Sequence, residues 1–289
     1  MKDTEEKVKI LRMTNNIDKE LLRIYKDILE NGEPRNDRTG VGTLATFFQT
    51  ISFDASKYAP VSQMRPIAVK GAIAEAIWIL KGRTDIEWLE EHKVKYWREW
   101  ADKDGKLGKV YGYQMRNFES KNNTCDQLKT LIDNLKSQPT GRRHLISLWN
   151  PANLSEQQLP PCHFLSQYYL DNNNTLHQIV MQRSCDFLLG VPHDLIIYKV
   201  FLDLIAQTIG AKSGMMNYVF GDSHIYKNHI PAAKWLIENK DKIVQPSEVV
   251  FEYNPIKTVF DIEPEDITVV NYSPNREFTK QGFDTKVAV

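Results

Sequence analysis

The fold of this chain depends on the run His163-Phe164-Leu165-Ser166-Gln167-Tyr168-Tyr169-Leu170, which is followed by Asp171-Asn172-Asn173-Asn174 and then by Thr175-Leu176-His177-Gln178-Ile179-Val180-Met181. The two outer runs are rich in aromatic and β-branched residues, which favour strands. The four residues between them have the composition of a tight turn. We therefore expect two neighbouring strands joined as a hairpin.

Helix-forming segments lie on both sides of this hairpin. Residues 17–31 carry apolar side chains at helical spacing, and residues 194–210 form a long apolar run that stops at Gly210. Strands and helices are mixed without a regular βαβ alternation, so we expect the α+β class, with a mixed β-sheet and flanking helices. Further helices are expected at 67–81, 86–89 and 124–136, and further strands at 45–53 and 144–149.

The whole chain, residues 1–289, is expected to form one domain, because it has no repeat, low-complexity tract or linker. Residues 1–14 are charged and are expected to be loosely held. The 37 basic and 37 acidic residues cancel, which argues against a broad electrostatic grip on DNA or on an anionic membrane. Without an apolar signal core or a spanning segment, the expected location is cytoplasmic.

Cys162 lies in Leu159-Pro160-Pro161-Cys162-His163, and the polar run Gln182-Arg183-Ser184-Cys185-Asp186 follows one hairpin later. A cysteine attacks as its thiolate, which a nearby guanidinium stabilises. The pair predicts covalent catalysis on a substrate that carries an anionic group. The alternative is that Cys162 is a small buried apolar residue, as free cysteines usually are. Cys185 is interpreted as core packing and Cys125 as incidental. No cysteine spacing suits a metal, and none is expected.

Four arginines are candidates for holding a phosphate, although an arginine is most often a solvated surface charge. Arg38 lies in a glycine-rich loop in which the backbone can approach an anion closely, and Arg142-Arg143 directly precede an expected strand. Arg183 and Ser184 would add a guanidinium and a hydroxyl donor.

Glu75 lies within the apolar helical stretch 67–81, where an unpaired carboxylate is costly. It is therefore exposed, paired or a proton-transfer group. Trp97, Trp100, Asp186 and His193 are interpreted either as residues flanking a flat ring or as ordinary core.

Taken together, the motifs resemble the thymidylate synthase family from Asn36 to Val289. The matching segments are Asn36-Asp37-Arg38-Thr39-Gly40-Val41-Gly42-Thr43, Trp97-Arg98-Glu99-Trp100-Ala101-Asp102, Val110-Tyr111-Gly112-Tyr113-Gln114, Arg142-Arg143, Leu159-Pro160-Pro161-Cys162-His163, Gln182-Arg183-Ser184-Cys185-Asp186, Leu189-Gly190-Val191-Pro192 and Gly221-Asp222-Ser223-His224-Ile225-Tyr226.

The resemblance implies a homodimer whose subunits pack their sheets face to face, a pyrimidine nucleoside monophosphate as substrate and 5,10-methylenetetrahydrofolate as one-carbon donor. It implies that Cys162 attacks C6 of the base, with Glu75 and Tyr111 managing protons. The remaining roles are also implied. The phosphate would lie at Arg38, Arg183 and Ser184, with Arg142 and Arg143 from the partner subunit, and the sugar at His224 and Tyr226. The base would lie near Gln167, Gln182, Gly190 and Asp194, with Asp194 also a catalytic residue. The folate would lie at Trp97, Trp100, Asp186, Gly190, His193 and Val289, with Asp186 also contacting the substrate.

Three departures from the family pattern stand out. The chain has Pro192-His193-Asp194 where thymidylate-forming members have Pro-Phe-Asn, Arg98 where an aspartate is common, and an altered stretch at Gln63-Met64-Arg65-Pro66. An asparagine amide pairs with O4 and N3–H of uracil, whereas a carboxylate accepts from the 4-amino group of cytosine. Asp194 therefore predicts a cytosine nucleotide and resembles the deoxycytidylate (dCMP) hydroxymethylase branch.

The reaction expected first is hydroxymethylation of dCMP at C5, because the polar imidazole of His193 would admit and orient a water. Trp97 and the tail Lys286-Val287-Ala288-Val289 resemble the family's closed site, which suits hydride transfer and a 5-methyl product. Three alternatives thus stay open: a dCMP methyltransferase, a thymidylate synthase acting on dUMP, and a binder of nucleotide or RNA without turnover.

Overall fold

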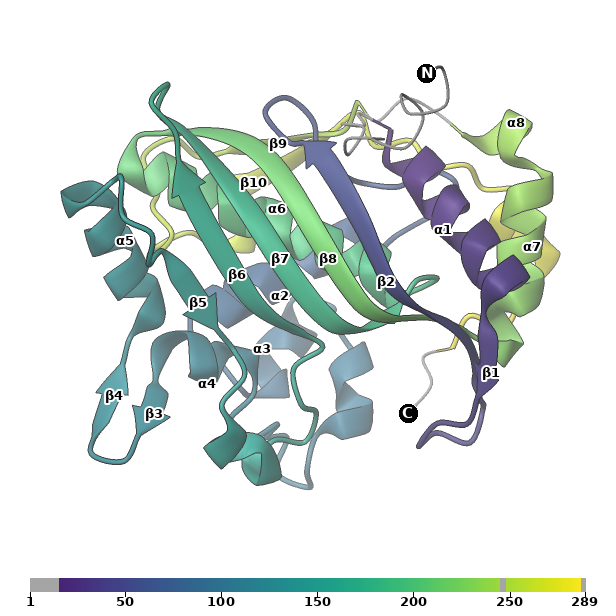
Figure 1. The fold of residues 1–289 in the computed structure, drawn as a ribbon, viewed down its shortest axis with the longest axis horizontal. Coiled ribbons are helices and arrows are strands. Elements are labelled where there is room, and N and C mark those ends of the chain that lie inside the picture. The colour runs from purple at the N-terminus through teal and green to yellow at the C-terminus, as the bar shows by residue number, and fades with distance from the viewer. Residues whose placement is uncertain (1–15, 245–247, 287–289) are drawn as a thin grey trace, which may run out of the picture.

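The computed structural model describes residues 16–244 and 248–286. The predictions for residues 1–14 and for Val289 fall outside these ranges. A mixed six-stranded sheet forms the centre of the molecule (Figure 1), with strand order β1-β2-β8-β7-β6-β5. Only β7 and β8 pair in parallel; the other neighbours are antiparallel. The strands are β1 Glu33–Arg35, β2 Thr43–Asp54, β5 Leu145–Ser147, β6 His163–Leu170, β7 Thr175–Asp186 and β8 Lys212–Tyr226.

Helices cover one face of the sheet, and α6 and α2 lie behind it in Figure 1. Two small hairpins are separate from the sheet: β3 Phe118–Ser120 with β4 Asn123–Cys125, and β9 Val250–Tyr253 with β10 Ile267–Val270. The helices are α1 Ile17–Asn31, α2 Val69–Leu80, α3 Ile86–Glu91, α4 Tyr111–Arg116, α5 Gln127–Ser137, α6 Gly190–Ile209, α7 Ile230–Glu238 and α8 Lys240–Ile243, and a 3₁₀ helix spans Tyr96–Trp100.

The α+β prediction is confirmed, and the predicted hairpin is β6 and β7. β7 runs further than expected, to Asp186, so the polar run 182–186 is part of the strand. The longest strand, β8, was not among the predicted elements. It pairs with β2 on one side and β7 on the other, which places its last residues beside the polar end of β7.

The start of α6 differs from the prediction in a way that matters for the site. The helix begins at Gly190 and not at residue 194, because Pro192 is tolerated in a first turn, where its missing N–H is not needed. His193 therefore lies in the first turn, and Asp194 directly follows it within the helix. The helix ends, as expected, at Gly210, which adopts a left-handed conformation at φ 73°.

Large apolar side chains fill the space between the sheet and its helices. Trp78 of α2, Phe201 of α6 and Phe220 of β8 are nearly inaccessible to solvent. The opposite face of the sheet is different: Leu145, Tyr169 and Ile179 are 41%, 64% and 42% exposed. Within the described ranges, no helix is both long and apolar enough to cross a bilayer.

Candidate active site

Cys162 lies immediately before β6, and its backbone is fixed from two sides. Its amide N–H donates to the Tyr111 hydroxyl over 2.9 Å, and its carbonyl accepts from the Arg183 amide over 2.8 Å. The Tyr111 ring stacks on His163 with centroids 4.4 Å apart. These contacts join α4, β6 and β7 at the thiol, as expected for Cys162, Tyr111 and Arg183.

The Arg183 guanidinium is oriented by the two prolines before the cysteine. Nε donates to the Pro161 carbonyl over 2.9 Å, and Nη2 donates to the Pro160 carbonyl over 3.1 Å. The group also lies over the Trp149 ring, 5.2 Å from its centroid. No described residue accepts from Nη1, so the guanidinium keeps donors for an anion.

Cys162 is half-buried, and opposing influences act on the pKa of its thiol. Burial and the nearby Asp194 carboxyl raise its pKa, while Arg183 and hydrogen bonds with Tyr111 and Ser184 act in the opposite direction. The net pKa lies above the usual thiol value, so the unliganded protein holds mainly the thiol. Cys185, which was expected in the core, is fully buried, and Cys125 is exposed.

Asp194, near the N-terminal end of α6, lies close enough to the Cys162 thiol to affect its charge. Its Oδ2 accepts from Gln182 Nε2 over 2.7 Å, and Oδ1 lies 3.9 Å from His163 Nε2. The Tyr218 hydroxyl donates to the Asp194 carbonyl over 3.1 Å. Burial, then the Glu75 charge, raise the pKa of Asp194 well above its ordinary value, although the Gln182 bond opposes this.

Glu75 was expected to be exposed, paired or a proton-transfer group. It is buried, and its carboxylate is paired. Trp97 Nε1 donates to Oε1 over 3.0 Å, while Oε2 contacts the Tyr96 hydroxyl and, at 3.1 Å, His193 Nε2. Burial raises the pKa of Glu75, but the bonds with His193, Tyr96 and Trp97 outweigh it and the net pKa is lowered. Glu75 is therefore a carboxylate at neutral pH. No role for Tyr96 was predicted; its position next to Trp97 was the available signal.

Aromatic rings form a wall beside this cluster. Trp97 lies 5.6 Å from Trp100 and 6.0 Å from Tyr111, both in edge-to-face arrangements. The buried Trp100 Nε1 has no hydrogen-bond partner among the described residues. A flat ring with polar edge atoms fits such a wall, because it would stack on the indoles and satisfy the free N–H.

The ends of β7 and β8 bring the predicted phosphate and sugar residues together. Ser184 is in register with Asp222, and Asp186 with His224. Gly221 permits this close pairing, because a Cβ there would lie 3.0 Å from the Arg183 carbonyl oxygen. Burial and the charges of Asp186 and Asp37 raise the pKa of Tyr226 to about 12, opposed by Arg38, so these groups share one electrostatic environment.

Most of the chain matches the model of a known protein family. Residues 19–282 match the family model described as thymidylate synthase. The chain belongs to the thymidylate synthase family. The family carries out folate-dependent one-carbon transfer to C5 of a pyrimidine nucleotide, with methylenetetrahydrofolate as donor, which indicates that this chain is a one-carbon transferase.

The remaining residues expected from the family pattern lie around β5, β6 and the start of α6. Arg142 and Arg143 are exposed before β5, and neither has an ion-pair partner within the described ranges. The prediction that Gln167 lies near the base is wrong: Gln167 is exposed and pairs with Ile179 on the open face, because alternate residues of β6 point to opposite sides. Gly190 does lie near Asp194, since a Cβ there would be 3.9 Å from Oδ2.

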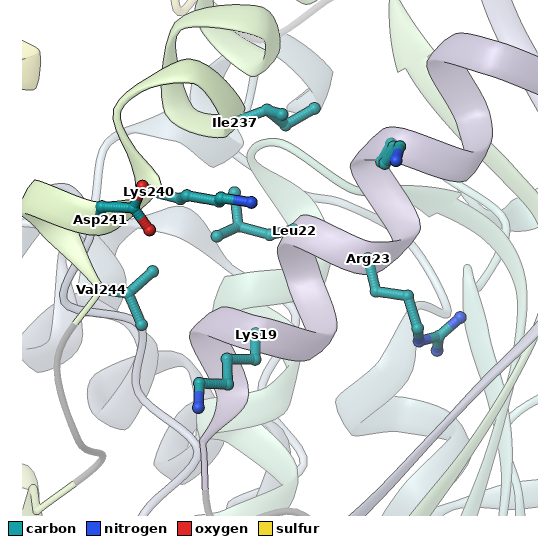
Figure 2. Close-up of a pocket in the computed structure, with 8 residues that line it drawn as sticks. Lys19, Leu22, Arg23, Ile237, Lys240, Asp241 and Val244 are labelled. Carbon is teal, nitrogen blue, oxygen red and sulfur yellow. The ribbon is translucent and has the colours of Figure 1, made fainter.

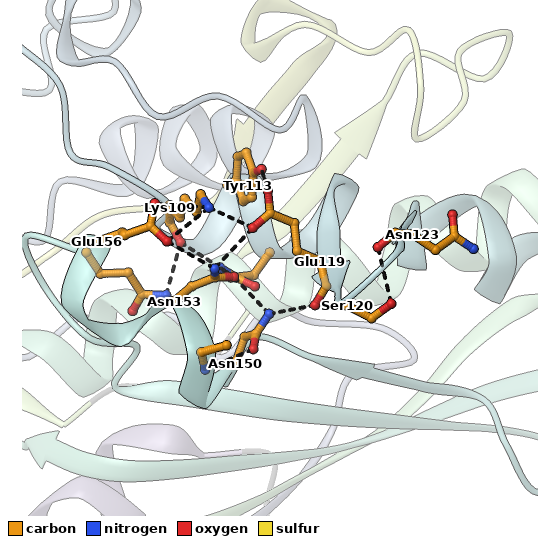
Figure 3. Close-up of polar contacts among 11 residues, drawn as sticks. Lys109, Tyr113, Glu119, Ser120, Asn123, Asn150, Asn153 and Glu156 are labelled. Carbon is orange, nitrogen blue, oxygen red and sulfur yellow. Dashed lines mark hydrogen bonds and ion pairs between the residues drawn. The ribbon is translucent and has the colours of Figure 1, made fainter.

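A polar network that sequence analysis did not single out holds the segment before Tyr111 (Figure 3). Lys109 Nζ lies 2.6 Å from Glu119 and 3.0 Å from Glu156, and the Lys109 carbonyl accepts from Gln114 and Gln157. Hydrogen bonding from Lys109, then from Tyr113, lowers the pKa of Glu119 to about 2. The network anchors the chain two residues before the tyrosine that contacts Cys162.

A separate cavity of about 450 Å³ lies between α1 and the α7–α8 region (Figure 2). Its lining includes Lys19, Leu22 and Arg23 from α1 and Ile237 and Lys240 from the other side. None of these residues belongs to a family motif in this chain. In the described ranges, no group of three or more His, Cys, Asp or Glu side chains is arranged to hold a metal.

Proposed function

We propose that this protein converts dCMP, 5,10-methylenetetrahydrofolate and water to 5-hydroxymethyl-dCMP and tetrahydrofolate. The observation that carries the choice of base is the carboxyl of Asp194, which is half-buried near the N-terminal end of α6 and held by Gln182 at 2.7 Å. Thymidylate-forming members would present an amide there.

The base preference follows from donor and acceptor matching. Because Gln182 donates to Oδ2, that oxygen acts as an acceptor, and a proton on Asp194 resides on Oδ1. Cytosine matches such a carboxyl at both positions. Its 4-amino group donates to the acceptor oxygen of Asp194, and its N3 accepts from the protonated oxygen. Uracil offers an oxygen at C4, so an acceptor of Asp194 would face another acceptor. Such a mismatch costs about 1–3 kcal/mol, or roughly tenfold to hundredfold in preference.

The remaining nucleotide groups have fitting residues nearby. Arg183, Ser184 and Arg38 would hold the phosphate, and His224 and Tyr226 would contact the sugar hydroxyl. His224 Nδ1 is fixed by Asp222 at 2.9 Å, which supports a defined ring orientation toward a ligand.

Cys162 would add as thiolate to C6 of the base, which makes C5 nucleophilic. The folate, held against Trp97 and Trp100, supplies a one-carbon unit at the oxidation level of formaldehyde. Glu75 and Tyr111 would manage the protons of the base through water, and Tyr111 also holds the Cys162 backbone at 2.9 Å.

The choice of water over hydride rests on His193. This imidazole replaces an apolar ring expected at the folate and contacts the Glu75 carboxylate at 3.1 Å, which makes the position polar and suited to hold a water. Retention of Trp97 favours the second candidate, a 5-methyl product. Its indole donates to Glu75 and keeps the site aromatic and closed, which suits hydride transfer.

We also propose a homodimer in which Arg142 and Arg143 reach the partner's phosphate site. The proposal is supported by the apolar row Leu145 and Ile179 on the open face of the sheet and by the exposure of both arginines beside it. Light scattering should give twice the mass of one chain; a monomer at micromolar concentration would contradict this part of the proposal.

The product assay tests the function. Purified protein is incubated with methylenetetrahydrofolate and, in parallel, dCMP, CMP or dUMP, and the nucleotides are analysed by mass. Hydroxymethyl-dCMP with tetrahydrofolate is expected. Gain of a methyl group with dihydrofolate would support the second candidate. Tight binding without turnover of any nucleotide would indicate a binding protein.

A further inference from the structure

Three side chains from separate elements meet at one point beside the aromatic wall. Tyr96 comes from the 3₁₀ helix, Glu75 from α2 and His193 from α6. The Tyr96 hydroxyl contacts Oε2 of Glu75 and lies 2.7 Å from His193 Nε2, which is itself 3.1 Å from the same Oε2. The rings of Tyr96 and His193 meet edge-on, with centroids 5.3 Å apart.

The protons of this trio can be assigned by counting donors. A carboxylate only accepts, and a tyrosine hydroxyl has a single proton. With Glu75 ionised, Tyr96 donates its proton to Oε2, so its oxygen can only accept from His193. Nε2 therefore carries the ring proton, and Nδ1 is left as a basic nitrogen with no partner among the described residues.

We propose that His193 Nδ1 is the general base that activates the water of hydroxymethylation, and that Tyr96 is the positioning residue that fixes its tautomer and direction. This inference rests on the proposed function and adds two roles to it. A carboxylate behind Nε2–H also stabilises the imidazolium that forms when Nδ1 takes a proton, as in other carboxylate–histidine pairs.

The step balances on the nucleotide and the chain. The water oxygen bonds to the exocyclic methylene carbon at C5, and the water proton goes to Nδ1. The methylene π pair moves to form C5=C6, and the C6–S bond breaks to release the Cys162 thiolate. The proton on His193 then returns to solvent or to the thiolate, and no oxidant or reductant is consumed.

The test separates this step from those that precede it. In single turnovers of the full chain with [5-³H]dCMP and methylenetetrahydrofolate, tritium release reports the steps up to loss of the C5 proton, and hydroxymethyl-dCMP reports water addition. We expect Tyr96→Phe to slow product formation at least about tenfold while tritium release stays within about twofold of wild type. His193→Phe should slow water addition about a hundredfold or more.

Tyr113→Phe is the matched control, because it also removes one tyrosine hydroxyl from a carboxylate, that of Glu119, but outside the site. It should leave the ratio of the two rates unchanged. If the wild type makes hydroxymethyl-dCMP but Tyr96→Phe and His193→Phe both leave the ratio of tritium release to product formation unchanged, this inference is overturned and the proposed function still stands. Equal slowing of tritium release and product would assign Tyr96 to an earlier step and also overturn it. A wild-type protein that makes only 5-methyl-dCMP or dTMP would overturn the proposed function.

Discussion

The side-chain amide of Gln182 donates to Oδ2 of Asp194 over 2.7 Å, linking the polar end of β7 to the N-terminal part of α6. The bond determines which oxygen of the acid is held as an acceptor. The Gln182 Oε1 atom is itself buried without a partner in the described ranges, so a donor on a bound nucleotide would satisfy it.

Gln182→Leu should weaken base selectivity, because the acid would lose the donor that orients it. We expect the ratio of kcat/KM for dCMP to that for dUMP to fall about tenfold. Gln178→Leu is the matched control: Gln178 is equally buried on β7 and donates to Tyr168, away from Asp194. A ratio unchanged in Gln182→Leu, or lowered equally by the control, would contradict the orienting role.

Asp194→Asn should change the pH dependence of stability in the unliganded protein. The folded-state pKa of Asp194 is raised, so the native state binds more protons than the unfolded state once pH exceeds the ordinary carboxyl pKa. Its stabilising effect is therefore complete at lower pH and is lost as pH rises through the folded pKa, by at most about 1.4 kcal/mol per pH unit. Denaturant melts at several pH values should show Asp194→Asn gaining stability relative to wild type as pH rises.

Asp222→Asn serves as a control of opposite sign. The hydrogen bond with His224 lowers the pKa of Asp222, so its contribution is present above the ordinary carboxyl pKa and is lost as pH falls through the folded pKa. Parallel curves for the Asp194→Asn and wild-type proteins would show that residue 194 does not bind its proton more tightly when folded.

Alkylation of Cys162 should require higher pH than that of an ordinary thiol, since burial and Asp194 raise its pKa. The rate of iodoacetamide labelling at Cys162, followed by peptide mass, should rise with pH as thiolate forms. Arg183→Gln should move that rise to still higher pH, because the guanidinium favours the thiolate. If Arg183→Gln does not change the pH dependence of the labelling rate, the guanidinium lies too far from the sulfur to affect its pKa.

Cys162→Ala should abolish both turnover and the covalent nucleotide adduct, because Cys185 is fully buried and therefore inaccessible to a substrate. Cys125→Ala, at the exposed cysteine, is the control and should keep both. Turnover close to wild type in Cys162→Ala would show that the nucleophile lies elsewhere.

The sequence predicted those parts of the fold whose signals are local. The β6–β7 hairpin follows from its turn composition, and α1 agrees with the predicted range 17–31 because its apolar side chains recur at helical spacing. β8 escaped prediction because Gly214 and Gly221 interrupt its pattern; its regular structure comes from pairing with β2 and β7 on both sides.

Site residues could be predicted where the residue type itself indicates a function. They could not be predicted where their role depends on which elements pack together. Cys162 and Glu75 stand out because a nucleophile and a buried acid need particular surroundings. Tyr96 resembles any core aromatic until the fold brings α2 and α6 to its hydroxyl. Gln167 was misplaced because a one-residue step along β6 moves a side chain to the opposite face of the sheet.

The most direct test of base recognition is the ratio of kcat/KM for dCMP to that for dUMP, measured for the wild type and for Asp194→Asn under identical conditions. We predict that the wild type favours dCMP about tenfold to hundredfold and that Asp194→Asn reverses the preference toward dUMP. A wild type that uses dUMP at least as well as dCMP, or a variant with unaltered preference, would contradict the account.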